Sequence, residues 1–436
     1  MISASLAGQA RATAAMITSR LADPAHIEAA VAASIPDPNA LGPRPPSSLL
    51  AGDAGIALLL RHAGDAPHEE ADRWRRAGHA ALLRAVRDTR EAPLTSAGIV
   101  TGSAGLALAM AEFAATDHRY RPGLDGVHIG LADQTRRRLA DGRPAGGPRF
   151  EDYDVLGGAS GVLGHLLTQA PDRTDPAPVH ALIDDLVRFC TAESEGHEPR
   201  WVVPLEHYPL PPRTTREAHG FINLGMAHGI PGPLAALALA WKSGYRRPRM
   251  GEAIANTVAA LSAAAVRDEF GVIWPGEIPV GPDGRHTEEH HPARSAWCYG
   301  VPGIAVALLT AADALADRRL RNFAIEAIEA DLRRVEATLD RRSPSLCHGL
   351  AGLLSIAEVF ARTTGSATAR AFLPVLTEHL LSHCSADLPF GVQNREPPDL
   401  KIDNPDFLCG AAGVAAALWT VSTPVSRGWQ RALLIA

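Results

Sequence analysis

One short pattern, Gly-x-x-Gly followed by an apolar run, occurs seven times along the 436 residues of the chain. The first glycines of the seven copies are Gly52, Gly102, Gly158, Gly229, Gly300, Gly349 and Gly410. Subtraction of successive positions gives spacings between 49 and 71 residues. Self-similarity at intervals of this order is typical of repeat architectures, in which each unit buries its apolar face against the next unit. We therefore expect each copy to mark one equivalent structural unit.

The segments between the glycines predict two kinds of helix. Small and aliphatic residues follow each Gly-x-x-Gly for two or three turns, which indicates an inner helix that is buried nearly all round. Amphipathic stretches with apolar residues three and four apart lie between these runs and predict outer helices at 71–90, 179–190, 251–268 and 319–339. Aromatic residues make up only 5% of the chain although 46% of it is apolar, which also favours close-packed helices. We predict an all-α fold in which the units close into a ring rather than stack into an open solenoid.

The glycines and two insertions indicate how the loops of the ring are built. A loop that enters a crowded axis must let backbones approach closely and adopt positive φ, which glycine does at the least steric cost. The two widest intervals between copies contain insertions at 199–212 and 270–286, which are rich in proline, glycine and β-branched residues. We expect these insertions to form short strands and loops over the rim of the ring.

The residues just before the first glycine of each copy carry the candidate chemistry. The position immediately before it holds Ala51, Thr101, Gly157, His228, Tyr299, His348 and Cys409 in chain order. The position one residue earlier holds Leu50, Val100, Leu156, Ala227, Cys298, Cys347 and Leu408. Because equivalent positions of a closed ring face one another around its axis, Cys298 and Cys347 should point from neighbouring copies to a common place, with His348 beside them. Two thiolates and an imidazole suit Zn²⁺ and leave the fourth tetrahedral position open.

Two other interpretations of these residues remain at this point. Cys298 and Cys347 could be small buried hydrophobic residues and His348 a hydrogen-bonded rim histidine, but their shared position in the repeat favours a metal site. Cys409 stands in the seventh copy where His348 stands in the sixth, so we expect it near the metal without being a required ligand. The histidines and glutamates of 286–291 lack helical spacing and lie in a segment rich in proline and glycine, which predicts a solvated loop.

Composition excludes several classes of function. The formal charge is 42 − 48 = −6 with no basic stripe, so a nucleic-acid partner is not expected. Five cysteines are an odd number scattered over a long chain, which does not resemble a disulfide framework. The first 20 residues lack the apolar stretch of a signal peptide, and no segment approaches the roughly 20 apolar residues that cross a bilayer. We expect a soluble, cytoplasmic protein without an integral membrane segment.

Three motifs resemble those of a known family. The segments NLGMAHGIPG (223–232), RSAWCYGVPG (294–303) and SLCHGLAG (345–352) are similar to the signature motifs of the lanthipeptide cyclases, and the repeats extend the resemblance over almost the whole chain. The resemblance implies one α/α-toroid domain over 1–436, with seven inner and seven outer helices. It implies addition of peptide cysteine thiols to dehydroalanine or dehydrobutyrine, which forms lanthionine or methyllanthionine thioether rings. It also implies a dehydrated precursor peptide with a leader as substrate, and a dehydratase as a candidate partner.

Carried over motif by motif, the resemblance implies a role for seven residues. The zinc ligands correspond to Cys298, Cys347 and His348, and the catalytic residues to His228, Arg294, Tyr299 and Asp154.

The chemistry of thioether formation explains these residue types independently. A cysteine thiol with a pKa near about 8.5 is mostly protonated at neutral pH, and coordination to zinc removes that proton. Addition to a dehydro residue generates an enolate, which needs a positive or hydrogen-bonding partner and then a proton on its α-carbon. Arg294 and His228 suit these two roles. From the residue types alone, Arg294 could instead be a surface ion-pair partner, Asp154 a loop or cap residue, and Tyr299 a packing residue with a supporting hydroxyl.

Three other functions compete with a peptide cyclase. The same site could add glutathione or another small thiol to dehydrated peptides. A non-catalytic, zinc-stabilised scaffold that binds a precursor peptide would not require His228 and Arg294, and would favour a closed site with four protein ligands. A helical-ring terpene cyclase or glycosidase would need acidic motifs at the mouth of the ring, whereas the acidic pair Asp184 and Asp185 is followed by Leu-Val-Arg.

Overall fold

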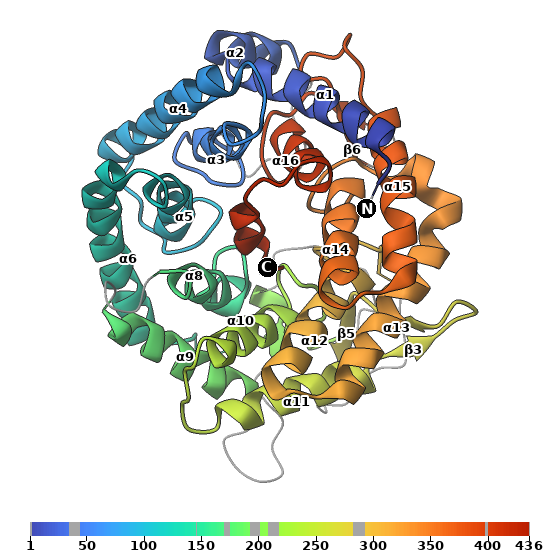
Figure 1. The fold of residues 1–436 in the computed structure, drawn as a ribbon. Coiled ribbons are helices and arrows are strands. Elements are labelled where there is room, and N and C mark those ends of the chain that lie inside the picture. The colour runs from blue at the N-terminus through green and yellow to red at the C-terminus, as the bar shows by residue number, and fades with distance from the viewer. Residues whose placement is uncertain are drawn as a thin grey trace.

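The inner ring of the protein consists of seven helices, one after each Gly-x-x-Gly loop. The structure is a computed structural model that describes residues 2–34, 44–144, 146–169, 175–191, 201–207, 218–281, 293–396 and 400–435. The inner helices are α3 (Asp53–Ala63), α5 (Ser103–Ala114), α8 (Ala159–Leu166), α10 (Pro231–Lys242), α12 (Val301–Leu315), α14 (Leu350–Thr363) and α16 (Ala411–Ser422). Each inner helix contacts the next, and α16 contacts α3, so the ring is closed (Figure 1).

Seven outer helices surround the inner ring, which confirms the predicted all-α toroid. They are α1 (Ala4–Leu21), α4 (Ala71–Glu91), α6 (Arg121–Asp141), α9 (Pro176–Cys190), α11 (Met250–Ala263), α13 (Arg318–Val335) and α15 (Ala367–Ser382). The N-terminal helix α1 packs on α16, so the two ends of the chain complete the same unit (Figure 1). A shorter helix, α2 (Pro24–Ala33), follows α1. The predicted stretches 251–268 and 319–339 are too long, because α11 ends at Ala263 and α13 gives way to a 3₁₀ helix at 336–341.

Burial explains why the two rings have different sequences. In the inner helix α14 every residue from Leu350 to Ala361 is buried, as expected of a helix packed on all sides. In the outer helix α13 the buried residues recur at three and four, and its charged residues are at least partly exposed except Asp331, which is buried and accepts a hydrogen bond from Ser295 Oγ. The inner helices therefore form the core, and the outer helices cover it with one apolar face each.

A closed circle of backbone hydrogen bonds joins the seven loops that precede the inner helices; we call it the backbone belt. In all seven bonds the accepting carbonyl belongs to the residue two positions before the first glycine. The bonds run from Leu49 N to Val100 O (3.1 Å), Val100 N to Leu156 O (3.1 Å), Val155 N to Ala227 O (3.1 Å), Ala227 N to Cys298 O (3.3 Å), Cys298 N to Cys347 O (3.1 Å), Cys347 N to Leu408 O (3.0 Å) and Leu408 N to Leu50 O (3.1 Å). The belt satisfies backbone groups that would otherwise be buried without partners.

Two glycines show why these loops tolerate no side chain. Gly300 has φ +114°, and a Cβ atom there would lie 1.8 Å from the carbonyl oxygen of Arg294. A Cβ atom on Gly225 would lie 2.5 Å from the carbonyl oxygen of Cys298. Both distances are far below van der Waals contact, so Gly300 permits the tight turn within the loop of the fifth copy, and Gly225 permits the loops of the fourth and fifth copies to approach each other.

Short antiparallel strands lie in the insertions. Strands β1 (Val202–Pro204), β2 (Gly220–Asn223) and β5 (Glu277–Val280) form one sheet in the order β1-β2-β5, with Val203 opposite Phe221 and Phe221 opposite Pro279. Two further pairs are β3 (Val266–Arg267) with β4 (Val272–Ile273), and β6 (Asn394–Glu396) with β7 (Leu400–Ile402). Strands were predicted in both insertions, but β2, the β6–β7 pair and β3 were not, and β3 lies in the stretch 251–268 that was predicted as helix. The acidic and histidine-rich segment 286–291 lies outside the described residues.

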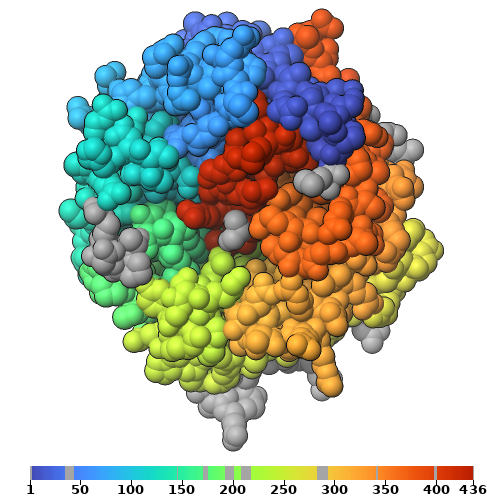
Figure 2. Space-filling model, viewed as in Figure 1, coloured from blue at the N-terminus to red at the C-terminus, as the bar shows by residue number. Residues whose placement is uncertain are grey.

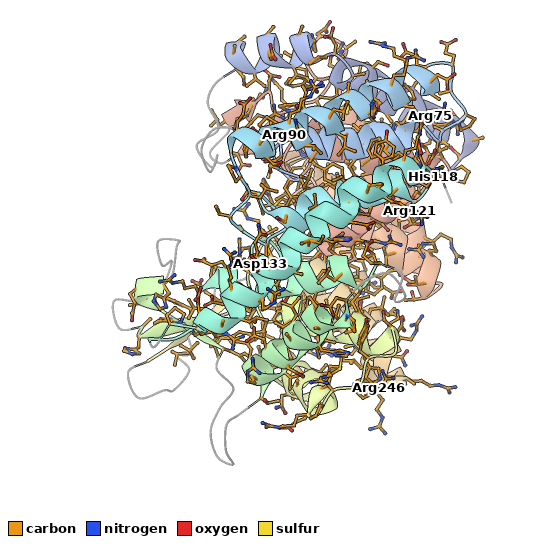
Figure 3. All side chains as sticks on the ribbon, turned by 90° about the vertical axis from the view of Figure 1, so that its left-hand side faces the viewer. Arg75, Arg90, His118, Arg121, Asp133 and Arg246 are labelled. Atoms are coloured by element: carbon orange, nitrogen blue, oxygen red, sulfur yellow. The ribbon has the colours of Figure 1, made fainter. Side chains whose placement is uncertain are left out.

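The two ends of the toroid differ. The strands project from the end of the toroid at which α6 finishes (Figure 3). Arg121, at the start of α6, lies at the opposite end. At that opposite end, the C-terminal residues with the 3₁₀ helix η4 (Gly428–Leu433) lie in the middle of the ring (Figures 1 and 2). Ion pairs attach this segment to inner helices, Arg427 to Glu358 at 3.0 Å and Arg431 to Glu112 at 3.5 Å.

Candidate active site

Cys298, Cys347 and His348 come together at one point of the backbone belt. One potential ligand atom of each residue lies within 4.8 Å of the others. Cys298 precedes α12 and Cys347 precedes α14, and the belt bond from Cys298 N to Cys347 O holds the two loops together. Cys298 is buried, and the other two residues are half-buried. The shared position in the repeat predicted this grouping.

The protonation of the cluster suits a divalent cation. A hydrogen bond with Cys347 lowers the pKa of Cys298 to about 7, and the positive charges of His348, Arg294 and His228 add to this effect against the cost of burial. The pKa of Cys347 is raised, because its thiol is hydrogen-bonded to Cys298 and Cys409. A thiolate therefore forms readily at Cys298. Two sulfur donors and an imidazole nitrogen are a donor set that Zn²⁺ prefers, so the residues fit the metal.

A buried carboxylate lies behind His348. Its Oε1 atom, on Glu396 of β6, is 2.8 Å from Nε2 of His348. Asn394 Nδ2 donates to the same oxygen at 2.8 Å, and Ser343 Oγ donates to Asn394 Oδ1 at 2.6 Å. Burial raises the pKa of Glu396, but the close contact with His348, the hydrogen bond from Asn394 and the charge of Arg294 outweigh it and lower the pKa below its usual value. Sequence analysis missed Glu396, because its segment lies outside the repeated positions.

His228 forms a dyad with Asp154. The distance from His228 Nδ1 to Asp154 Oδ2 is 2.7 Å, and Asp154 is buried. The other carboxylate oxygen, Oδ1, accepts hydrogen bonds from the backbone N–H groups of Gly157 and Gly158, both at 2.7 Å. The imidazole also stacks on Phe150, with ring centroids 5.1 Å apart. Asp154 thus fixes the loop that precedes α8 and also orients His228, which leaves Nε2 of His228 for another partner.

Tyr299 and Arg294 flank the same loops. The ring of Tyr299 lies 6.5 Å from that of His228, and its hydroxyl accepts a hydrogen bond from Asn223 Nδ2 at 2.9 Å. Burial raises the pKa of Tyr299, so the hydroxyl stays protonated. Arg294 is exposed, and no carboxylate of the described residues pairs with it, although its charge acts on Cys298 and Glu396. Asn223, which sequence analysis did not single out, ties Tyr299 to strand β2.

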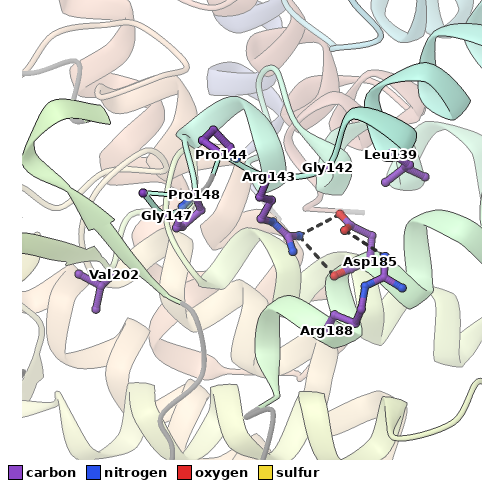
Figure 4. Close-up of a pocket in the computed structure, with 10 residues that line it drawn as sticks. Leu139, Gly142, Arg143, Pro144, Gly147, Pro148, Asp185, Arg188 and Val202 are labelled. Atoms are coloured by element: carbon purple, nitrogen blue, oxygen red, sulfur yellow. Dashed lines mark hydrogen bonds and ion pairs between the residues drawn. The ribbon is translucent and has the colours of Figure 1, made fainter.

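Two pockets lie away from this cluster of side chains. A pocket of about 550 Å³ lies between the end of α6, the loop 142–148 and α9 (Figure 4). Asp185 there joins Arg143 at 2.9 Å and Arg188 at 3.4 Å. A second pocket, of about 370 Å³, lies beside the C-terminal segment. None of the predicted site residues lines either of these two pockets.

Comparison with known proteins places the chain in a family. The model of the family described as lanthionine synthetase C-like protein matches residues 44–434. The chain belongs to this family. The nisin biosynthesis protein NisC of Lactococcus lactis subsp. lactis is 26% identical over 279 residues, which are 62% of this chain and 63% of that protein. The matched part is thus less than two thirds of that relative.

A solved structure shows that the fold of this lanthionine synthetase C-like protein is shared. The structure of nisin cyclase superposes with a TM-score of 0.74 at 22% sequence identity, over 90% of this chain and 93% of that chain. The likeness covers both rings and therefore agrees with the closed double toroid. Within the part of the chain that the structure describes, no helix is both long and apolar enough to cross a bilayer.

Proposed function

We propose that this lanthionine synthetase C-like protein is a zinc-dependent cyclase that acts on a dehydrated precursor peptide. It adds peptide cysteine thiols to dehydroalanine or dehydrobutyrine and so forms lanthionine or methyllanthionine rings, with residues 1–436 as one catalytic domain. The observation that carries the proposal is the presence, on adjacent loops, of a three-donor metal cluster and the Asp154–His228 dyad. A metal site that serves only the fold does not require an oriented histidine beside it.

Three protein donors leave room for the substrate. Cys298, Cys347 and His348 would hold the zinc, which supplies a fixed place where a substrate thiol loses its proton and remains nucleophilic. Two thiolate donors offset the charge of Zn²⁺, which suits a nucleophile that must stay electron-rich. Cys409 hydrogen-bonds to Cys347 but is not part of the 4.8 Å cluster, so the geometry favours an open site over a closed one.

His228 is the proposed acid and base. Its Nδ1 atom faces Asp154, so the remaining ring nitrogen, Nε2, can accept the proton of a substrate thiol and return a proton to the α-carbon of the enolate. Stacking on Phe150 and the hydrogen bond to Asp154 fix the plane of the imidazole.

Arg294 and Tyr299 are the proposed stabilising residues. Arg294 is exposed and has no carboxylate partner among the described residues, so its guanidinium can approach the enolate oxygen of a bound peptide. The Tyr299 hydroxyl accepts from Asn223 and keeps its own proton to donate. Both groups can offset negative charge that develops during the addition.

The test uses a synthetic peptide that contains one dehydroalanine and one cysteine, with purified protein and a known zinc content. Because ring closure leaves the peptide mass unchanged, free thiols are counted by alkylation before mass spectrometry. Zinc-dependent loss of the free thiol supports the cyclase. A dehydrated peptide without cysteine, incubated with glutathione, tests the small-thiol alternative by a mass gain. Zinc binding with neither reaction would overturn the enzyme and support a peptide-binding scaffold that recruits a dehydratase.

A further inference from the structure

We propose that Glu396 is a positioning residue that holds His348 in the orientation needed to bind the metal; this inference rests on the zinc site of the proposed function. The two side chains are in contact, with His348 Nε2 2.8 Å from Glu396 Oε1. Glu396 is 7% exposed, so water competes little for its carboxylate. Glu396 is not one of the three residues of the cluster, and the contact that links it to the cluster is the one with His348.

The carboxylate is itself fixed by a buried chain of hydrogen bonds. Asn394 Nδ2 donates to Glu396 Oε1, and Asn394 Oδ1 accepts from Ser343 Oγ. Ser343, Asn394 and Glu396 are all less than 9% exposed. Ser343 begins the loop that carries Cys347 and His348, and its carbonyl oxygen accepts from the backbone N–H of Leu350. These hydrogen bonds therefore connect strand β6 to both ends of the loop that carries Cys347 and His348.

The contact also selects one ring nitrogen. An imidazole that donates Nε2–H to a carboxylate keeps its lone pair on Nδ1, which is the form that a metal ligand requires. The ring N–H is not aligned closely enough with Oε1 to count as a hydrogen bond, although the atoms are in ion-pair contact. The carboxylate also raises the basicity of the imidazole, which strengthens its bond to a cation.

The origin of Glu396 supports this role. The residue lies in an insertion before the seventh copy, whereas the metal donors belong to the fifth and sixth copies. The insertion thus supplies a group that the repeated loops themselves lack. A carboxylate buried for stability alone would be expected to pair with a permanent cation, as Glu358 of α14 does with Arg362 and Arg427.

The experiment compares zinc affinity in Glu396→Ala, Glu396→Gln and the control Glu358→Gln. Glu358 is also a buried carboxylate, 8% exposed, but its partners are arginines away from the cluster. Competition with a chromophoric chelator measures the dissociation constant. Loss of a supporting carboxylate weakens metal binding by about 10- to 100-fold, so we expect this range for Glu396→Ala and a smaller loss for Glu396→Gln, whose amide oxygen still accepts. Glu358→Gln should bind zinc as the wild type does.

A second readout separates positioning from general destabilisation. In the Co²⁺-substituted protein, sulfur-to-cobalt charge-transfer bands report the thiolates and d–d bands report the whole ligand set. Glu396→Ala should keep the former and shift the latter, because only the imidazole is misplaced. Unchanged zinc affinity in Glu396→Ala, or an equal loss in Glu358→Gln, would overturn the inference. Absence of tight zinc binding in the wild type would instead overturn the zinc site of the proposed function.

Discussion

The backbone belt has two arcs with the same hydrogen bonds and different side chains. In the first three copies the two positions before the glycine hold Leu50 and Ala51, Val100 and Thr101, and Leu156 and Gly157. In the last four copies the same positions include His228, Cys298, Tyr299, Cys347, His348 and Cys409. The belt bonds are 3.1 Å in the first arc and 3.0 to 3.3 Å in the second. The backbone thus has the same arrangement in all seven copies. The two arcs differ in the side chains that these positions carry.

The arcs also differ in what covers them. Among the described residues, all seven strands lie in segments before the fourth, fifth and seventh copies. Asn223 of β2 holds Tyr299, and Glu396 of β6 contacts His348. The first arc has no such strands within the described residues. The reactive arc therefore receives side-chain contacts from these strands, which the described residues of the apolar arc do not, and substitutions at equivalent positions should have different consequences.

The largest difference is expected between Cys298→Ala or Cys347→Ala and Leu156→Ala. Each cysteine variant should lose its zinc and all measurable cyclisation, because a two-donor site holds the metal poorly. Leu156 occupies the same belt position in the apolar arc and is half-buried. The Leu156→Ala variant should therefore keep its zinc and lose about 1 kcal/mol of unfolding free energy. Metal analysis and chemical denaturation measure both effects. A full equivalent of zinc in either cysteine variant would refute the ligand assignment.

His228→Ala should have the next largest effect. The equivalent position of the third copy is Gly157, which has no side chain. The difference between these two positions is therefore the imidazole of His228. We expect the variant to keep its zinc and to cyclise about 10²- to 10⁴-fold more slowly, the usual contribution of a positioned acid or base. Alkylation of free thiols follows the rate. A wild-type rate, or loss of zinc together with activity, would show that His228 has another role.

Asp154→Asn should have a smaller effect than His228→Ala. The asparagine oxygen can still accept from the N–H groups of Gly157 and Gly158, so the start of α8 should remain intact. The lost charge weakens a hydrogen bond to His228 that contributes about 1.5–3 kcal/mol, or about 10- to 100-fold in rate. Zinc content should not change. Thermal denaturation checks the fold, and a rate equal to that of the wild type would remove Asp154 from the dyad.

Cys409→Ala should have the smallest effect. Cys409 lies at the end of the reactive arc and hydrogen-bonds to Cys347 without joining the cluster. We expect zinc content and cyclisation to stay close to those of the wild type. Loss of the metal in this variant would mean that the site has four protein ligands and would revive the scaffold function.

Much of the fold was predictable because it is local and repeated. Each Gly-x-x-Gly marks the start of an inner helix, and 71–90 and 179–190 correspond closely to the outer helices α4 and α9. The N-terminal helix α1 was not recognised as the seventh outer helix, because its contact with α16 joins opposite ends of the chain. The central place of η4 was missed for the same reason, since Trp297 meets the carbonyl oxygen of Leu433 across 136 residues.

The sequence by itself determined the ring of helices and the places of Cys298, Cys347 and His348, because glycines and apolar periodicity act within a few residues and recur in every copy. The tertiary structure alone decided the partners of those residues. Glu396 reaches His348 from a strand outside the repeated loops, and Asp154 reaches His228 from the loop of the neighbouring copy. Such contacts depend on how the ring closes and how its insertions fold over it, and no local preference of the chain encodes them.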